Sequence, residues 1–181
     1  MKLNTLQDLY IEELRDLYSA ENQLLKALAK VAEEATSEEL RSALEDHLDQ
    51  TKEQVERLDE VFQNLGASSK GKKCLAMEGL IKECEELLKE DMDENVKDAA
   101  IIGACQKIEH YEIASYGTVC TYAKLLDRED DLDLLGQTLD EEKEADENLT
   151  DIAESSINFE AAEGEEEEEE EEAPAARKKS R

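Results

Sequence analysis

The segment at residues 101–123, IIGACQKIEHYEIASYGTVCTYA, decides the fold. Its inward positions recur every three or four residues, which is the spacing of one face of an α-helix. Apolar residues fill most of these positions, but Glu109, Glu112 and Tyr116 interrupt the stripe near its middle. The segment therefore predicts a long helix that buries one face and carries two acids on that face.

Four further stretches have the same helical spacing, and none alternates as a strand would. The five predicted helices cover residues 5–34, 39–65, 75–90, 94–126 and 131–157. Thr36 or Ser37 can cap the second helix, and Gly66 is suited to end it. The chain has only one proline and seven glycines, so few residues would break these helices.

The order of these helices predicts an all-α, ferritin-like antiparallel four-helix bundle. Two helical hairpins are joined by a longer crossover that holds a short extra helix, as in ferritin-like folds. We expect the bundle to span residues 1–158. Residues 159–181 contain a run of eight glutamates and a basic C-terminus, cannot bury a core, and are expected to form a disordered tail.

The composition restricts partners and location. The formal net charge of −29 repels nucleic-acid phosphates and attracts cations, so we expect no direct nucleic-acid binding. No apolar run is long enough to cross a membrane, and the first residues do not resemble a signal peptide, so a cytoplasmic protein is expected. The four cysteines form no Cys-x-x-Cys pair and are expected to be reduced core residues.

Ionisable residues occupy inward positions of four of the predicted helices. They are Glu21, His47, Glu109, Glu112, Glu142 and Asp146. Each lies 12 to 19 residues from the turn of its own hairpin, which corresponds to roughly 20–28 Å along a helix. Packing the two hairpins together would therefore bring these residues into one layer near the middle of the bundle.

Buried carboxylates must be paired or bound to metal, because burying an unpaired charge is costly. Glu109 and Glu112 are three residues apart, and Glu142 and Asp146 are four apart, so each pair directs its oxygens to one side. Oxygen ligands with one imidazole, from His47, suit iron or manganese. The alternatives are that these acids stay solvated at the edge of the stripe, or pair with lysine or tyrosine side chains.

Four segments resemble the YciF/YciE-type ferritin-like proteins. They are LYIEELRDLYSAE at residues 9–21, KCLAMEGLI at 73–81, QKIEHYEIASYGT at 106–118, and TLDEEK at 138–143 with Asp146. The resemblance covers about residues 3–155 and implies a ferritin-like bundle, usually a homodimer, from bacterial proteins linked to stress responses. It also implies a di-metal centre at the family's acidic and histidine positions, which here are Asp16, Glu21, His47, Glu109, Glu112, Glu142 and Asp146.

The sequence departs from that pattern at one position. Relatives often carry Glu three residues after the histidine, where this chain has Gln50. The chain also lacks the two Glu-x-x-His motifs of typical di-iron carboxylate proteins, since Leu44 stands three residues before His47. The resemblance brings no assigned reaction, so whether the chain is an enzyme stays open.

Three functional hypotheses follow. The first is a di-iron or di-manganese bundle that oxidises bound metal or removes peroxide during stress. Glu109 or Glu112 would bridge the ions in this hypothesis, and the terminal ligands would be Glu21, His47, Glu142 and Asp146. The second is a non-catalytic dimeric scaffold whose polar layer is a hydrogen-bonded network. The third is an acidic protein that buffers cations through its tail.

Overall fold

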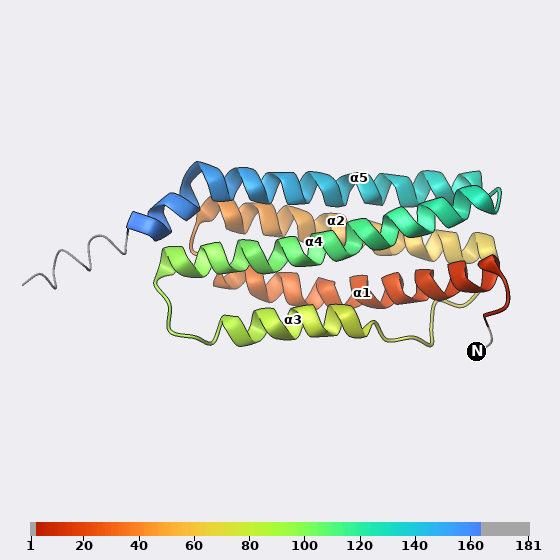
Figure 1. Cartoon of the computed structure of the whole chain (residues 1–181), viewed down its shortest axis with the longest axis horizontal. Coiled ribbons are helices and arrows are strands. Elements are labelled where there is room, and N and C mark those ends of the chain that lie inside the picture. The colour runs from red at the N-terminus through yellow and green to blue at the C-terminus, as the bar shows by residue number, and fades with distance from the viewer. Residues whose placement is uncertain (1–2, 164–181) are drawn as a thin grey trace, which may run out of the picture.

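The computed structural model describes residues 3–163, and this part of the chain is helical with no strand (Figure 1). The predicted all-α, ferritin-like four-helix bundle is confirmed. Its α-helices are α1 (Leu6–Glu34), α2 (Glu38–Leu65), α3 (Leu75–Leu87), α4 (Glu94–Leu125) and α5 (Glu129–Ile152). None of the helices within residues 3–163 is long and apolar enough to cross a membrane.

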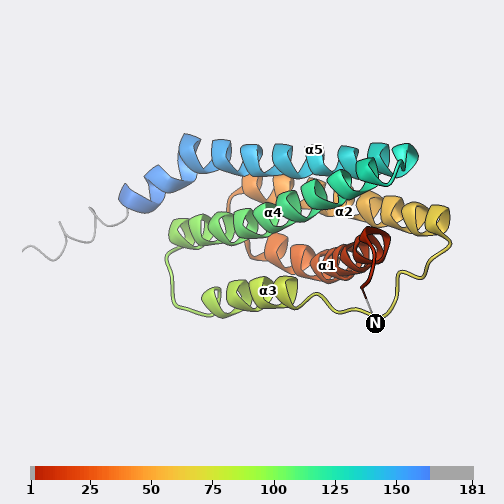
Figure 2. The ribbon, with the colours of Figure 1, turned by 45° about the vertical axis from the view of Figure 1, so that its right-hand side comes forward.

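The bundle is made of two antiparallel hairpins, α1–α2 and α4–α5, which lie side by side along the long axis (Figure 1). α3 lies outside the bundle and packs against α1 and α4, as the turned view in Figure 2 shows. The crossover that contains α3 returns the chain along the bundle, so α4 begins at the end where α1 finishes. This topology places the middles of all four long helices at a similar height.

The helix ends are fixed by local capping. Thr5 and Asp8 form a capping box at the start of α1, which satisfies two otherwise free backbone N–H groups. The Ser37 hydroxyl accepts from the backbone N–H of Leu40 and so caps α2. α2 ends at Gly66, whose φ of 59° lies in the left-handed region that glycine adopts without steric cost.

The C-terminal end of the bundle differs from the predicted helix 131–157. α5 passes into a π-helical turn, Ala153–Ile157, and residues 158–163 are again helical. Ala153 and Ile157 are both buried, so this turn still packs against the bundle. Helical structure thus continues past the expected boundary at residue 158, and the remainder of the predicted tail, 164–181, lies outside the described residues.

The core consists of two aliphatic clusters. The first core packs against α3 and includes Leu24, Leu28, Leu44, Ile102 and Leu149. The second core lies at the opposite end of the bundle, and its members include Leu14, Leu17, Leu58, Val119 and Leu135. Fully burying one such side chain contributes about 1.5–3 kcal/mol, so these two cores supply the main stabilisation. The residues between them along each helix are mostly polar.

Candidate metal centre

The polar layer between the two cores receives side chains from all four long helices. Glu21 comes from α1, His47 from α2, Glu109 and Glu112 from α4, and Glu142 from α5. All five are buried, with exposed fractions of 0–6%. One ligand atom from each of His47, Glu109, Glu112 and Glu142 can be chosen such that all four lie within 4.8 Å of one another. Glu21 is buried in the same layer, and we call the five residues together the central cluster.

His47 is oriented with one ring nitrogen facing the cluster. Its Nε2 lies 3.4 Å from Glu109 Oε2 and 3.8 Å from Glu142 Oε2. The other nitrogen, Nδ1, lies 3.4 Å from Gln50 Oε1. Because that oxygen can only accept, a proton on Nδ1 would donate to Gln50. A neutral imidazole with its proton on Nδ1 would offer its Nε2 lone pair to a metal ion, whereas a protonated His47 faces Glu109 as an ion-pair partner.

Two carboxylates of the central cluster are held by neutral donors. The Tyr116 hydroxyl donates to Glu21 Oε1 at 2.5 Å, and the Gln54 amide donates to Glu142 Oε1. In each case the other carboxylate oxygen is left without a hydrogen-bond partner. These second-sphere contacts orient a carboxylate while leaving an oxygen available for a ligand, which is a common arrangement around metal sites.

The structure does not place Asp146 with the central cluster. Its carboxylate accepts from the Gln106 amide at 3.1 Å and lies 3.4 Å from His110 Nε2. An advance of four residues turns a helix by about 40° and moves one turn along it, so Asp146 lies beside α4 rather than beneath Glu142. Asp16 also lies elsewhere, where it accepts from the Tyr111 hydroxyl at 2.6 Å and pairs with Lys72.

Burial and mutual charge shift the protonation of the central cluster. Burial alone lowers the pKa of His47, but the Glu109 carboxylate outweighs it and raises that pKa to about 9. Burial raises the pKa of Glu109, yet the charge of His47 outweighs it, and the pKa is lowered. Burial raises the pKa of Glu21 to about 7. Burial and neighbouring carboxylates raise the pKa values of Glu112 and Glu142 well above the ordinary range.

Whether these residues fit a metal can be judged from the buried side-chain atoms that lack a hydrogen-bond partner. Within residues 3–163, every buried side-chain nitrogen or oxygen without a hydrogen-bond partner belongs to the central cluster or to the adjacent Gln54. These atoms are Glu21 Oε2, His47 Nε2, Gln54 Oε1, Glu109 Oε2, both oxygens of Glu112, and Glu142 Oε2. Leaving one such atom unpaired costs about 1–3 kcal/mol. Hard oxygen donors with one imidazole fit iron or manganese.

Comparison with known proteins assigns the family. A family model described as a domain of unknown function (DUF892) matches residues 5–162. Protein YciF of Escherichia coli (strain K12) is 46% identical over 162 residues, which are 89% of this chain and 98% of that protein. The chain belongs to the YciF family.

Three solved structures agree with the fold. The crystal structure of the E. coli stress protein YciF has a TM-score of 0.83 and 46% identity, covering 86% of this chain and 99% of that one. YcfI from Rhodopseudomonas palustris, provisionally described as a structural protein, has a TM-score of 0.80 and 45% identity, covering 82% and 95%. A protein from Xanthomonas campestris has the same fold at a TM-score of 0.71 and 20% identity, covering 89% and 98%.

A buried ion pair next to the central cluster was not predicted from the sequence. Arg57 of α2 is 9% exposed and donates two hydrogen bonds to Glu141, at 2.8 and 2.6 Å, and one to Thr138 at 2.7 Å. Arg57 follows Gln54 by three residues and so shares its helix face. A basic residue at such a position gives no signal of burial in the sequence, because its partner Glu141 lies on another helix.

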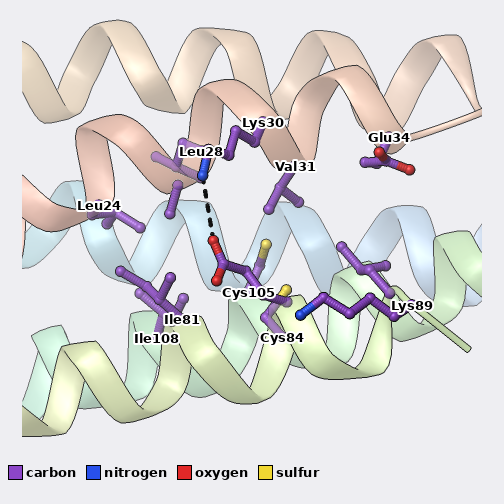
Figure 3. Close-up of a pocket in the computed structure, with 13 residues that line it drawn as sticks. Leu24, Leu28, Lys30, Val31, Glu34, Ile81, Cys84, Lys89, Cys105 and Ile108 are labelled. Carbon is purple, nitrogen blue, oxygen red and sulfur yellow. Dashed lines mark hydrogen bonds and ion pairs between the residues drawn. The ribbon is translucent and has the colours of Figure 1, made fainter.

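Two cavities border the bundle interior. The first, of about 340 Å³, lies between α1, α3 and α4 and is lined mainly by aliphatic side chains together with Cys84 and Cys105 (Figure 3). The second, of about 450 Å³, lies between α2 and α5, and His47 and Glu109 line it. Only the second of these two therefore reaches side chains of the central cluster.

Proposed function

We propose that this YciF-family chain is a stress-response protein whose central cluster binds two divalent ions, iron or manganese. The set of buried, unpaired ligand atoms in one layer is the observation that carries the proposal. Glu21, Glu109, Glu112 and Glu142 supply four negative charges when ionised, which two divalent cations neutralise. The charge balance gives a physical reason for placing four carboxylates between two aliphatic cores.

The proposal gives each residue of the cluster a role. Glu112, whose oxygens both lack a hydrogen-bond partner, would bridge two ions, and Glu109 would be the alternative bridge. Glu21, His47 and Glu142 would be terminal ligands, oriented by Tyr116, Gln50 and Gln54. Asp146, a ligand in the sequence hypothesis, has protein partners of its own and is left out of the proposed set.

Metal-dependent redox chemistry is the activity that this site would support. When bound, iron or manganese would supply one-electron oxidation and reduction and open positions for dioxygen or peroxide. The surrounding aliphatic cores would exclude bulk water, and the raised pKa values of the carboxylates mean that protons leave as cations enter. The relation to a stress protein fits the oxidation of ferrous iron or the removal of peroxide.

Metal content tests the proposal directly. Metal-free protein is incubated anaerobically with Fe²⁺ or Mn²⁺, desalted, and measured by inductively coupled plasma mass spectrometry. We expect about two ions per chain, and a loss of most of them in Glu112→Gln. The matched control is Asp131→Asn, which alters a buried carboxylate that hydrogen bonds to Tyr10, Asn64 and Arg128 outside the cluster. Equal metal content in the two variants would contradict the proposal.

A second candidate function is a non-catalytic scaffold, which one contact favours. His47 and Glu109 already form a buried ion pair, so part of the layer is satisfied by protein alone. In that case the layer would specify how the helices align, and no metal would bind. Sedimentation analysis would test for the homodimer that a scaffold function requires. The scaffold function would be rejected if metal binding were stoichiometric and lost in Glu112→Gln.

A further inference from the structure

The cavity between α2 and α5 connects the molecular surface with the central cluster. His47 and Glu109 line it, and they are only 6% and 1% exposed, so they form its inner end. There, His47 Nε2 and Glu109 Oε2 lie 3.4 Å apart without a hydrogen bond, and each is a potential metal ligand. A solute that entered this cavity would therefore meet two potential ligands at its base.

The outer rim of this cavity is acidic. Asp46 on α2 and Glu144, Glu147 and Asp151 on α5 line it, and all four are exposed. No lysine or arginine is among the lining residues, and none of these four acids forms an ion pair with another residue in the described range 3–163. A concave site lined by one sign of charge concentrates the opposite ion and speeds its association.

The aliphatic cavity between α1, α3 and α4 differs in rim charge from the cavity between α2 and α5. Its rim carries both signs, because Lys30, Glu34, Glu85 and Lys89 line it, and Lys30 pairs with Glu85 at 3.4 Å (Figure 3). Its wall is aliphatic, and taking a divalent ion across such a surface is costly. The two cavities differ in the charge of their rims and in the buried His47 and Glu109 side chains, which line only the cavity between α2 and α5.

We propose that the cavity between α2 and α5 is the route by which hydrated divalent cations reach the central cluster. The rim carboxylates attract the cation, and His47 and Glu109 are its first ligands inside. Gln50 also lines the cavity and contacts His47 Nδ1, which keeps the reactive Nε2 facing inward. This inference rests on the proposed metal-binding function and adds the ligand's charge class and its path.

The test measures the rate of metal uptake separately from the final amount. Co²⁺ is mixed with metal-free protein in a stopped-flow instrument, and the d–d absorbance of the bound ion is followed. The rim variant combines Asp46→Asn, Glu144→Gln and Glu147→Gln. A matched control combines Glu33→Gln, Glu60→Gln and Glu90→Gln, which removes the same charge from exposed sites outside this cavity.

At low ionic strength, we expect uptake in the rim variant to be about ten-fold slower than in the control. The difference should shrink in 0.5 M salt, because screening shortens the reach of the rim charges. Final occupancy, measured by mass spectrometry, should be the same in both. Equal uptake rates at low salt would overturn the proposed route while leaving the metal site intact. A parent chain that binds no Co²⁺, Fe²⁺ or Mn²⁺ would overturn both.

Discussion

The two aliphatic cores and the polar layer between them are equally buried, yet different forces hold them. Leu14 and Glu112 are both 0% exposed. Leu14 gains from leaving water, whereas Glu112 loses hydration and faces the carboxyl groups of Glu21 and Glu109. The cores therefore stabilise the bundle, and the layer reduces its stability unless a ligand is bound. A layer that costs stability at the centre of a bundle points to function.

The largest expected effect comes from the cores. Leu14→Ala should lower the free energy of unfolding by about 2–5 kcal/mol, because it removes buried methyl groups and leaves a cavity. Urea denaturation followed by circular dichroism measures the change. Leu75→Ala, at a position that is 72% exposed, is the control and should cost less than about 0.5 kcal/mol. Similar losses in the two variants would mean that the second core is not a principal source of stability.

Bound metal should make the polar layer stabilise the bundle, whereas without metal the layer destabilises it. At a free Mn²⁺ concentration about 100 times the dissociation constant, the free energy of unfolding should rise by about 2.7 kcal/mol. The rise should disappear in Glu112→Leu and persist in Asp131→Asn. Thermal unfolding with and without chelator measures it. Stabilisation that survives Glu112→Leu would place the ion elsewhere on this acidic chain.

The pH dependence of the metal-free protein should also come from the layer. Glu21 has a pKa raised from 4.5 to about 7, and His47 has one raised from 6.5 to about 9. The folded state thus holds these protons more tightly than the unfolded state, and stability falls as pH rises through both ranges. Glu109 has a lowered pKa, so its contribution is instead lost in acid.

Together these shifts predict maximum stability near pH 5 and a progressive loss of stability between pH 5 and pH 9. Denaturant melts at intervals of one pH unit measure the curve. His47→Gln should make the fall above pH 6.5 shallower, because the imidazole contributes to the curve in that range. With metal present the trend should reverse, because ligands must lose protons to bind. A curve that is flat between pH 5 and 9 would contradict the buried protonation described for the layer.

Most helix ends and the central cluster could be predicted from the sequence, because the residue patterns that determine them are local. The spacing of apolar residues, the Ser37 cap and Gly66 place most helix ends to within about three residues. The central cluster follows from polar residues at inward positions and from counting along each hairpin. Glu21 and His47 lie far from Glu109 along the chain. Counting residues from each hairpin turn is enough to predict that they lie at the same height as Glu109 in the bundle.

The remaining features depend on tertiary packing. Asp146 lies one turn beyond Glu142, and whether it faces inward depends on Gln106 and His110 of the neighbouring helix. The burial of Arg57 could not be predicted locally, because basic side chains are rarely buried without a partner and its partner Glu141 lies on another helix. The π-helical turn at Ala153–Ile157 left no signal in the apolar spacing.

The smallest expected effect on the free energy of unfolding comes from replacing a buried acid of the polar layer with the leucine that is typical of the cores. In metal-free protein, Glu112→Leu replaces an unpaired buried carboxylate with an aliphatic side chain. The free energy of unfolding should therefore stay constant or rise by about 1 kcal/mol. Glu142→Leu should gain less, because it removes one of the two hydrogen bonds of the Gln54 amide and leaves only the one to Glu141. Urea denaturation in the presence of chelator measures both.

Asp131→Leu is the control for this last comparison. Its carboxylate is also buried, but it accepts from Tyr10 and Asn64 and pairs with Arg128, so removing it should cost about 2 kcal/mol. The opposite signs at two buried acids would separate a carboxylate that holds the fold from one kept for a ligand. If Glu112→Leu were as destabilising as Asp131→Leu, then Glu112 would be a structural residue and the layer a protein network, as the scaffold hypothesis requires.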